Sequence, residues 1–371
     1  MTGRAPIGRP GLGTRGALVL LAIVALVVLW IAVRRDEAPV GAEPTAASVL
    51  DAVPAGAVAV VQVDVAGLRK TALGASLFNK QGRAIAGLGD VTTICGGDPM
   101  TAVTELAVVL PEGSETGFGL FARGNFDAEE FMRCAEKIVA DRRGKPVRVS
   151  DGRFMVLHDA TLTSDAAKLA VADDGPLLLA PPGYLSEALA VAQNRAASIA
   201  GDMQHRWLRD HISAGHIVVT AVMTPLHRKQ LVELLEEEGK KDSPLLALTS
   251  AALSLHVGPE LVLHGLVRCD SAKGCERAAQ HFENIVRGFA GSLKARLTGL
   301  SPVLHRLRVE LDGTCFHVRL QAPEQLVWKL LTLWTSTRQP PPPSREALPL
   351  KDAPGIPADA GVRIDAKDAG H

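Results

Sequence analysis

Five cysteines are the residues of this chain with the clearest chemical potential, because thiols form disulfides, bind metals or act as nucleophiles. They are Cys95, Cys134, Cys269, Cys275 and Cys315. No two of them form a C-x-x-C pair, which argues against a zinc ribbon and against a thioredoxin-like redox motif. Disulfide bonding in an oxidising compartment is therefore the chemistry that this set favours.

Cys95 and Cys134 are predicted to form one disulfide. Cys134 lies on a helix that we expect to begin near Asp127, and Cys95 precedes a strand expected to begin near Glu105. Both thiols are therefore expected at the same end of one domain. The alternative is a pair of buried free thiols.

The three remaining cysteines, Cys269, Cys275 and Cys315, allow one bridge at most. A Cys269–Cys275 bond and a pairing with Cys315 are both compatible with the sequence, because distances between thiols are not encoded in spacing alone. One cysteine is expected to remain free.

Histidine and arginine alternate with apolar residues in the second half of the chain. Successive side chains of a strand point to opposite faces of a sheet. Leu253, Leu255 and Leu263 fall on one face, and polar residues fall on the other. The predicted polar face contains His256, His264, Arg268, Arg306, Arg308, His317 and Arg319.

This polar face has three interpretations. One is a surface that binds an anionic ligand or an envelope protein partner, more strongly when the histidines are protonated. Another is an ordinary solvated sheet face. A metal site is disfavoured because the spacing matches no metal signature and carboxylates are few there. We therefore assign no metal ligand and no cofactor.

Local enzyme signatures are absent from the sequence. We find no G-x-S-x-G, P-loop, H-E-x-x-H or EF-hand pattern. The stretch from Gly11 to Gly16 matches G-x-G-x-x-G, but it follows no strand and precedes no amphipathic helix, so it is no dinucleotide site. We expect a protein without catalytic residues, with a hydrolase lacking a local signature as a less favoured reading.

Composition makes nucleic acids and sugars less favoured as ligands. The chain has 40 basic and 40 acidic residues, so bulk charge gives no reason to expect nucleic-acid binding. Aromatic residues make up 4% of the chain. Sugars and single-stranded nucleic acids are usually bound by stacking on aromatic rings, so both become less favoured.

An N-terminal membrane helix is predicted over residues 16–35, after a short basic tail at residues 1–15. Gly16 to Val33 are 18 residues without a charge, near the lower limit for a span. Three arginines in the tail weakly favour a cytoplasmic N-terminus and main domains outside the cytoplasm. A cleaved export signal is the alternative, since Val40-Gly41-Ala42 resembles a cleavage site.

The rest of the chain is predicted to be a linker, two repeats and a tail. The linker covers residues 36–56, and residues 337–371, with four consecutive prolines, are expected to be disordered. The same series of strand and helix patterns occurs in residues 57–205 and in residues 206–336. Each series begins strand-helix-strand-strand-helix-strand, which is the ferredoxin-like order. We expect an α+β protein with mainly antiparallel sheets.

Two stretches, "CGGDPMTAVTELAVVLP" from Cys95 and "ARGNFDAEEFMRCAEKIV" from Ala122, resemble bacterial envelope proteins of unknown function. Those proteins have one N-terminal transmembrane helix and a duplicated α+β exterior domain. The resemblance implies no activity. We therefore expect a single-pass membrane protein of the envelope that binds or scaffolds. The alternative is a carrier or sensor with a ligand pocket between the two repeats.

Overall fold

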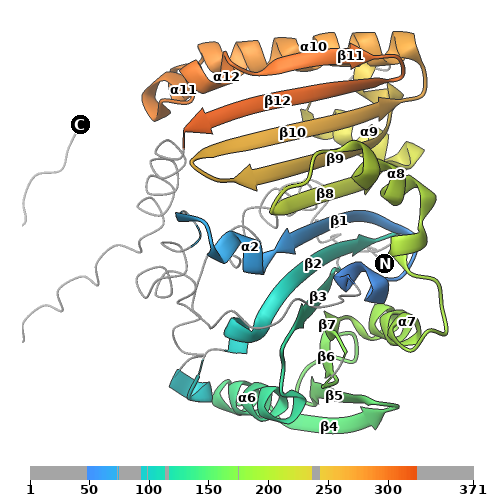
Figure 1. Ribbon diagram of the computed structural model, residues 1–371. Helices are drawn as coiled ribbons and strands as arrows, with labels where there is room; N and C mark the ends of the chain where they lie inside the picture. The colour runs from blue at the N-terminus through green and yellow to red at the C-terminus, as the bar shows by residue number, and fades with distance from the viewer. Residues whose placement is uncertain are drawn as a thin grey trace, which may run out of the picture. The chain divides into compact units, whose positions relative to one another are not determined.

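In the computed structural model, the strands lie side by side in one antiparallel sheet (Figure 1). The structure describes residues 48–72, 74, 93–97, 99–112, 117–173, 175–235 and 243–323. Within these residues the sheet has twelve strands in the order β11-β12-β10-β9-β8-β1-β2-β3-β7-β6-β5-β4. The expected α+β class with a mainly antiparallel sheet is confirmed.

The first part of the chain forms the sheet from β1 to β4. Its elements are η1 (Val49–Ala52), β1 (Ala57–Asp64), α2 (Val65–Arg69), η2 (Pro99–Ala102), β2 (Val103–Pro111), β3 (Gly119–Gly124), α6 (Ala128–Asp141), β4 (Pro146–Asp151), β5 (Phe154–Asp159), β6 (Lys168–Val171), β7 (Leu177–Ala180), α7 (Pro182–Ala192) and η3 (Ile199–Gly201).

The second part forms the sheet from β8 to β11. Its elements are α8 (Met203–His211), β8 (Ile217–Val222), α9 (Pro225–Leu235), η4 (Pro244–Ala247), β9 (Leu248–Val257), β10 (Glu260–Cys269), α10 (Ala272–Gly291), α11 (Leu293–Thr298), α12 (Ser301–Leu304), β11 (Arg308–Asp312) and β12 (Cys315–Pro323). Helix α8 crosses the predicted boundary between residues 205 and 206.

Local sequence explains how these elements begin and turn. The Asp127 carboxylate accepts a hydrogen bond from the Glu130 N–H at the start of α6, which satisfies an amide that has no partner inside the helix. The β4–β5 and β11–β12 hairpins turn at Gly152 and Gly313, both with φ of 58°. This left-handed conformation is strained for other residues, so the two Asp-Gly turns place glycine where the backbone requires it.

The two parts are joined by their first strands. β1 pairs with β8 antiparallel, with Val61 opposite Val219, so one sheet runs through both parts. Outward from this junction, β1, β2 and β3 are neighbours, as are β8, β9 and β10. The order of elements along the chain is the ferredoxin-like one, but the first three strands of each part pair as a meander rather than as a split β-α-β unit. Beyond these meanders, β3 pairs with β7 and β10 pairs with β12.

Each part has its own apolar core. In the first part, α7 and η1 pack over a cluster that includes Phe121, Phe154 and Leu178, all essentially without solvent exposure. In the second part, the buried side of α10, with Cys275 and Ala278, packs against Phe316 of β12. Burial of these side chains is the main favourable contribution to the stability of both parts.

The predicted linker over residues 36–56 is too long at its C-terminal end. Ser48 caps η1, and Val49, Leu50 and Val53 are buried in the core of the first part. The mixture of alanine, proline and glycine resembles a tether in sequence, but these apolar side chains pack against α7 and β2. The folded part therefore includes residues 48–56.

The predicted basic tail, membrane helix and disordered C-terminal tail lie outside the described residues. The chain divides into two compact units, residues 1–330 and 331–371, and the second unit also lies outside them. Among the helices that the structure describes, none is long and apolar enough to cross a membrane.

Candidate functional site

The predicted polar residues of the strands share one face of the second part. Residues that pair across antiparallel strands point to the same side of a sheet. His264 lies opposite both Ser254 and Arg319, and Arg319 lies opposite Arg308. Register and alternation therefore align a set on one side of the sheet, which we call the polar face: His256, His264, Arg268, Arg308, His317 and Arg319. The seventh predicted residue, Arg306, lies in the turn between α12 and β11.

This polar face is open only in part, whereas the sequence predicted an open face throughout. Leu208 and Ile212 of the α8 region pack against Ala252 and Leu266 of the sheet. His264 is only 9% exposed as a result. Alternation predicts which residues share a face, but the helix that covers the face comes from another segment. The exposed end of the polar face lies at β11 and β12.

His264 is the centre of a short hydrogen-bond chain. Its Nδ1 accepts a hydrogen bond from the Ser213 hydroxyl at 2.9 Å and lies 3.2 Å from the Ser213 amide nitrogen, which donates to it. Its Nε2 lies 3.1 Å from Nδ1 of His317, and the two rings are stacked. Because Nδ1 accepts, the proton of the neutral ring is on Nε2.

Burial lowers the pKa of His264, and the neighbouring charges of His317 and Arg319 lower it further. The ring is therefore a hydrogen-bonding group near neutral pH rather than a cation. Ser213 also lies 3.1 Å from the Ser254 hydroxyl. The chain of bonds ties the loop after α8 to β9, β10 and β12.

Two further histidines stabilise the junction of the two parts. His205 is 1% exposed. Its Nε2 donates to the Ala57 carbonyl of β1 at 2.9 Å, and its Nδ1 accepts from the Thr220 hydroxyl of β8 at 2.8 Å. His216 stacks on His256 and accepts a hydrogen bond from the Val257 N–H. Burial, as the largest cause, lowers the pKa of both His205 and His216.

Arg268 and His211 both contact the ring of Trp207. The Arg268 guanidinium lies 4.8 Å from the centre of the Trp207 ring. His211 stacks on the same ring, with the ring centres 4.2 Å apart. A cation above an indole face is attracted by the negative charge of that face. Arg268 therefore helps to hold α8 on the sheet and is less available to a ligand than Arg308 or Arg319.

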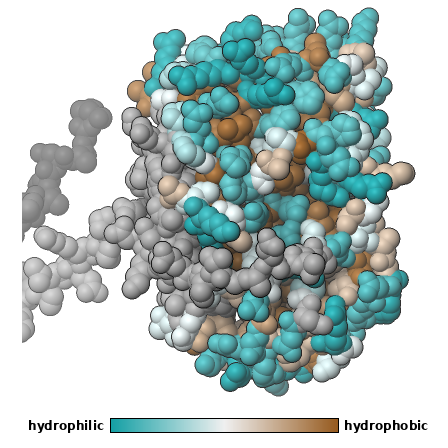
Figure 2. Space-filling view, in the orientation of Figure 1, coloured by the Kyte–Doolittle hydropathy of each residue, from teal (hydrophilic) through white to brown (hydrophobic). Residues whose placement is uncertain are grey.

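A depression of about 600 Å³ lies at the exposed end of the polar face. Among the described residues it is lined by Glu260, Val262, His305, Arg306, Arg308, Glu310, Arg319, Leu320, Gln321, Ala322 and Pro323. Arg319 lies 3.7 Å from the Glu310 carboxylate, and both side chains are exposed. Figure 2 shows hydrophilic residues prevailing at the top of the view, where Figure 1 places α10, β11 and β12.

The cysteines form two disulfides in the part of the chain that the structure describes. Cys95 bonds to Cys134, the pair expected from the sequence, with Cα atoms 4.9 Å apart. Cys269 bonds to Cys275, which resolves the choice that the sequence left open. Cys315 is free and half-buried, and burial raises the pKa of its thiol. No group of three or more metal-binding side chains gathers anywhere in the described ranges.

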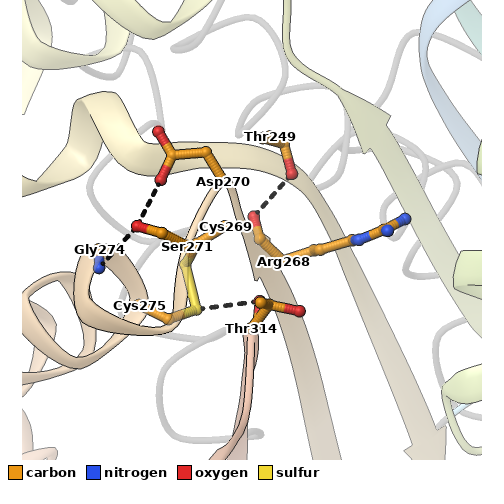
Figure 3. The surroundings of a disulfide bond; sticks show 8 residues. All are labelled: Thr249, Arg268, Cys269, Asp270, Ser271, Gly274, Cys275 and Thr314. Atoms are coloured by element: carbon orange, nitrogen blue, oxygen red, sulfur yellow. Dashed lines mark hydrogen bonds between the residues drawn. A yellow bond between two sulfur atoms is a disulfide. The ribbon is translucent and has the colours of Figure 1, made fainter.

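The second disulfide fastens the end of β10 to the first turns of α10 (Figure 3). Ser271 caps that helix by accepting a hydrogen bond from the Gly274 N–H. The Thr314 carbonyl, in the β11–β12 turn, lies 3.2 Å from Sγ of Cys275. The disulfide therefore lies on the side of β10 and β12 that packs against α10, and the polar face is the opposite side of these strands.

Sequence reasoning missed four residues near the polar face: Trp207, Ser213, His205 and His216. All four lie in α8 or between α8 and β8, close to the predicted boundary between the two repeats. The concentration of histidine in the second half was the available signal. No local pattern identifies Ser213, because its partner His264 is 51 residues away.

Comparisons with known proteins give little beyond this geometry. No protein-family model and no curated protein matches the chain. One solved structure, crystal form I of TP0453, is similar with a TM-score of 0.45 and 11% sequence identity. The match covers 78% of this chain and 100% of that one.

Proposed function

We propose that this protein is a single-pass, membrane-anchored binding module of the bacterial envelope that binds its partner through the polar face. The alignment of histidine and arginine from the four strands β9, β10, β11 and β12 beside α8 is the observation that carries the proposal. Charged and hydrogen-bonding groups on a stiff sheet suit recognition, because little side-chain and backbone entropy is lost on binding. We assign no catalytic residue to the chain.

The two disulfides support an extracytoplasmic location. Structural disulfides persist in oxidising compartments and are rare in the cytosol. Two bonds account for four of the five cysteines. The apolar stretch of residues 16–35 would then anchor the protein with its N-terminus in the cytoplasm.

Topology and thiol state test this location together. Denatured, unreduced protein from intact cells should react with a thiol reagent at Cys315 alone, and after reduction at all five cysteines. Protease added outside the inner membrane should cleave the main domain. Five reactive thiols before reduction, with a protected domain, would place the protein in the cytoplasm and end this part of the proposal.

Duplication is the second part of the proposal. Both parts follow the order strand, helix, strand, strand, helix, hairpin. Their first strands, β1 and β8, pair antiparallel, and the hairpins β4–β5 and β11–β12 both lie at outer edges of the sheet. This arrangement supports two ferredoxin-like-order repeats related by an approximate twofold axis at the junction.

Site-specific photocrosslinking in living cells tests the polar face as the binding surface. A photoreactive amino acid would replace exposed His256 or Arg319, and in a control it would replace exposed Gln280 on α10. We expect a discrete crosslinked species from the first two positions and none from the third. Equal patterns at all three positions would contradict the proposal.

A hydrolase is the second candidate, favoured by the contact between the Ser213 hydroxyl and His264. A hydroxyl beside an imidazole that is oriented by a third group has the layout of an activated nucleophile. Against this role, Nδ1 of His264 also accepts a hydrogen bond from the Ser213 N–H. This second bond indicates that His264 holds the loop after α8 in place. Labelling by a fluorophosphonate that is lost in Ser213→Ala would establish the hydrolase instead.

A further inference from the structure

Two arginines face each other across the outer hairpin of the second part. Arg308 and Arg319 are direct partners in the β11–β12 register. Like charges in this position repel and destabilise a hairpin, whereas a ligand of opposite charge turns the same pair into a site. Glu310 lies 3.7 Å from Arg319 and balances only part of the charge.

The surroundings of this pair are concave and positively charged. Arg306 lines the same depression, which holds three arginines against two glutamates, Glu260 and Glu310. Within the described part of the chain, neither Arg306 nor Arg308 makes an ion pair with a carboxylate. The volume of about 600 Å³ lies in the range of sites for small organic molecules.

The chemistry of the lining favours a phosphate group. A guanidinium presents a planar fork of N–H donors that matches phosphate oxygens, and several such forks stabilise a doubly charged anion better than a singly charged one. Gln321 adds a neutral side chain that both donates and accepts, which suits hydroxyl groups next to the phosphate. The described lining includes no tryptophan, tyrosine or phenylalanine, so stacking of a nucleobase is not favoured.

We propose that the depression between β11, β12 and the turn before β11 binds the phosphate group of a small phosphorylated molecule through Arg306, Arg308 and Arg319. This inference rests on the proposed binding function and specifies the ligand chemistry at one end of the polar face. The depression lies at the outer edge of the second part, so the site differs from a pocket between the two repeats.

Calorimetric titration of the full chain in a nonionic detergent tests the inference. The probe is inorganic pyrophosphate at low ionic strength. We expect saturable binding that weakens as salt rises, and a loss of about tenfold or more in affinity for each of Arg306→Gln, Arg308→Gln and Arg319→Gln. Arg277→Gln on α10 removes the same charge from an exposed site elsewhere and should change affinity less than about twofold.

Thermal unfolding is the second measurement, because a variant that misfolds would also lose binding. Pyrophosphate should raise the unfolding midpoint of the wild-type protein but not of Arg308→Gln. Without the probe, Arg308→Gln should unfold at the same or a higher temperature, since it removes the repulsion from Arg319. A large drop in its midpoint would show that Arg308 is structural and would overturn the inference.

Two further ligands distinguish a phosphate group on a lipid from one on a small soluble molecule. Tighter binding of short-chain phosphatidic acid than of glycerol phosphate would assign the site to a lipid headgroup, and the reverse to a free phosphomonoester. No binding of any probe at millimolar concentration, or equal binding by all four variants, would refute the site. The polar face would still stand as a protein-binding surface if the crosslinks form, so the two proposals fail separately.

Discussion

The same side of the sheet is used differently in the two parts of the molecule. In the first part, Phe121 and Phe154 fill it, and α7 and η1 cover them. In the second part, Ser254, His264 and His317 take the corresponding side, and α8 covers only a portion. A sheet face that is closed by apolar packing contributes stability, whereas a partly covered polar face leaves charged and hydrogen-bonding groups exposed to solvent. The two parts therefore use the same side of the sheet for different kinds of side chain.

The largest expected effect concerns the closed face. Phe121 is fully buried, and its ring packs against that of Tyr184 in a T-shaped arrangement. Phe121→Ala should lower the free energy of unfolding by about 3–5 kcal/mol, because it removes a large buried side chain and leaves a cavity. Leu311→Ala, at a residue 55% exposed in β11, should change it by less than about 0.5 kcal/mol. Chemical denaturation of both variants measures the contrast, and similar losses would contradict it.

The two disulfides should contribute unequally. They join residues 39 and 6 positions apart. By the loop-entropy relation, replacing Cys95 and Cys134 with alanine should cost about 4 kcal/mol, and replacing Cys269 and Cys275 about 2 kcal/mol. Denaturation of the two double variants, with Cys315→Ala as the control, compares the parts directly. A larger loss from the shorter loop would show that the second part depends more on its bridge.

Stability should depend on pH through the histidines at the junction and in the second part. Burial lowers the pKa values of His205, His216 and His264 in the folded protein. Their unfolded pKa is about 6.5, so stability is complete above that pH and decreases as pH falls from there toward the lowered folded values. The denaturant concentration at the unfolding midpoint should therefore decrease as the pH is lowered from 7.5 to 5.0.

His205→Gln tests the origin of that pH dependence. The glutamine does not titrate, so the decrease between pH 7.5 and 5.0 should become smaller than in the wild type. Gln280→Ala, at an exposed position on α10, removes no titratable group and is the control that should keep the full decrease. An unchanged decrease in His205→Gln would exclude His205 as its source.

The smallest effect is expected at the surface ion pairs. Arg148 of β4 contacts Glu129 and Glu136 of α6 at 2.7 and 2.9 Å, and Arg319 lies 3.7 Å from Glu310. Glu136→Gln should lower the free energy of unfolding by about 0.2–1 kcal/mol, and Glu310→Gln by less. Denaturation at low and at high salt checks both. If the loss in free energy of unfolding were the same at high salt as at low salt, the ion pair would not be a screened surface interaction.

Local patterns identified most strands and helices and six of the seven predicted members of the polar face. Period-two alternation predicted that His264, Arg268 and Arg319 share a side, because the pleat of a strand makes side-chain direction a property of sequence parity. The Asp-Gly turns predicted both hairpins for the same kind of reason, since Gly152 and Gly313 adopt positive φ. The position of Cys95 before a strand and of Cys134 on a helix pointed to their bond.

Tertiary structure decided what covers the face and how the parts join. The pairing of Val61 with Val219 unites strands far apart in the chain, and no local pattern specifies which apolar strand pairs with which. The same long-range folding brings α8 onto the sheet and places Ser213 on His264. Alternation assigns a side chain to a side of the sheet, but its burial and its partners depend on segments that the chain brings in from elsewhere.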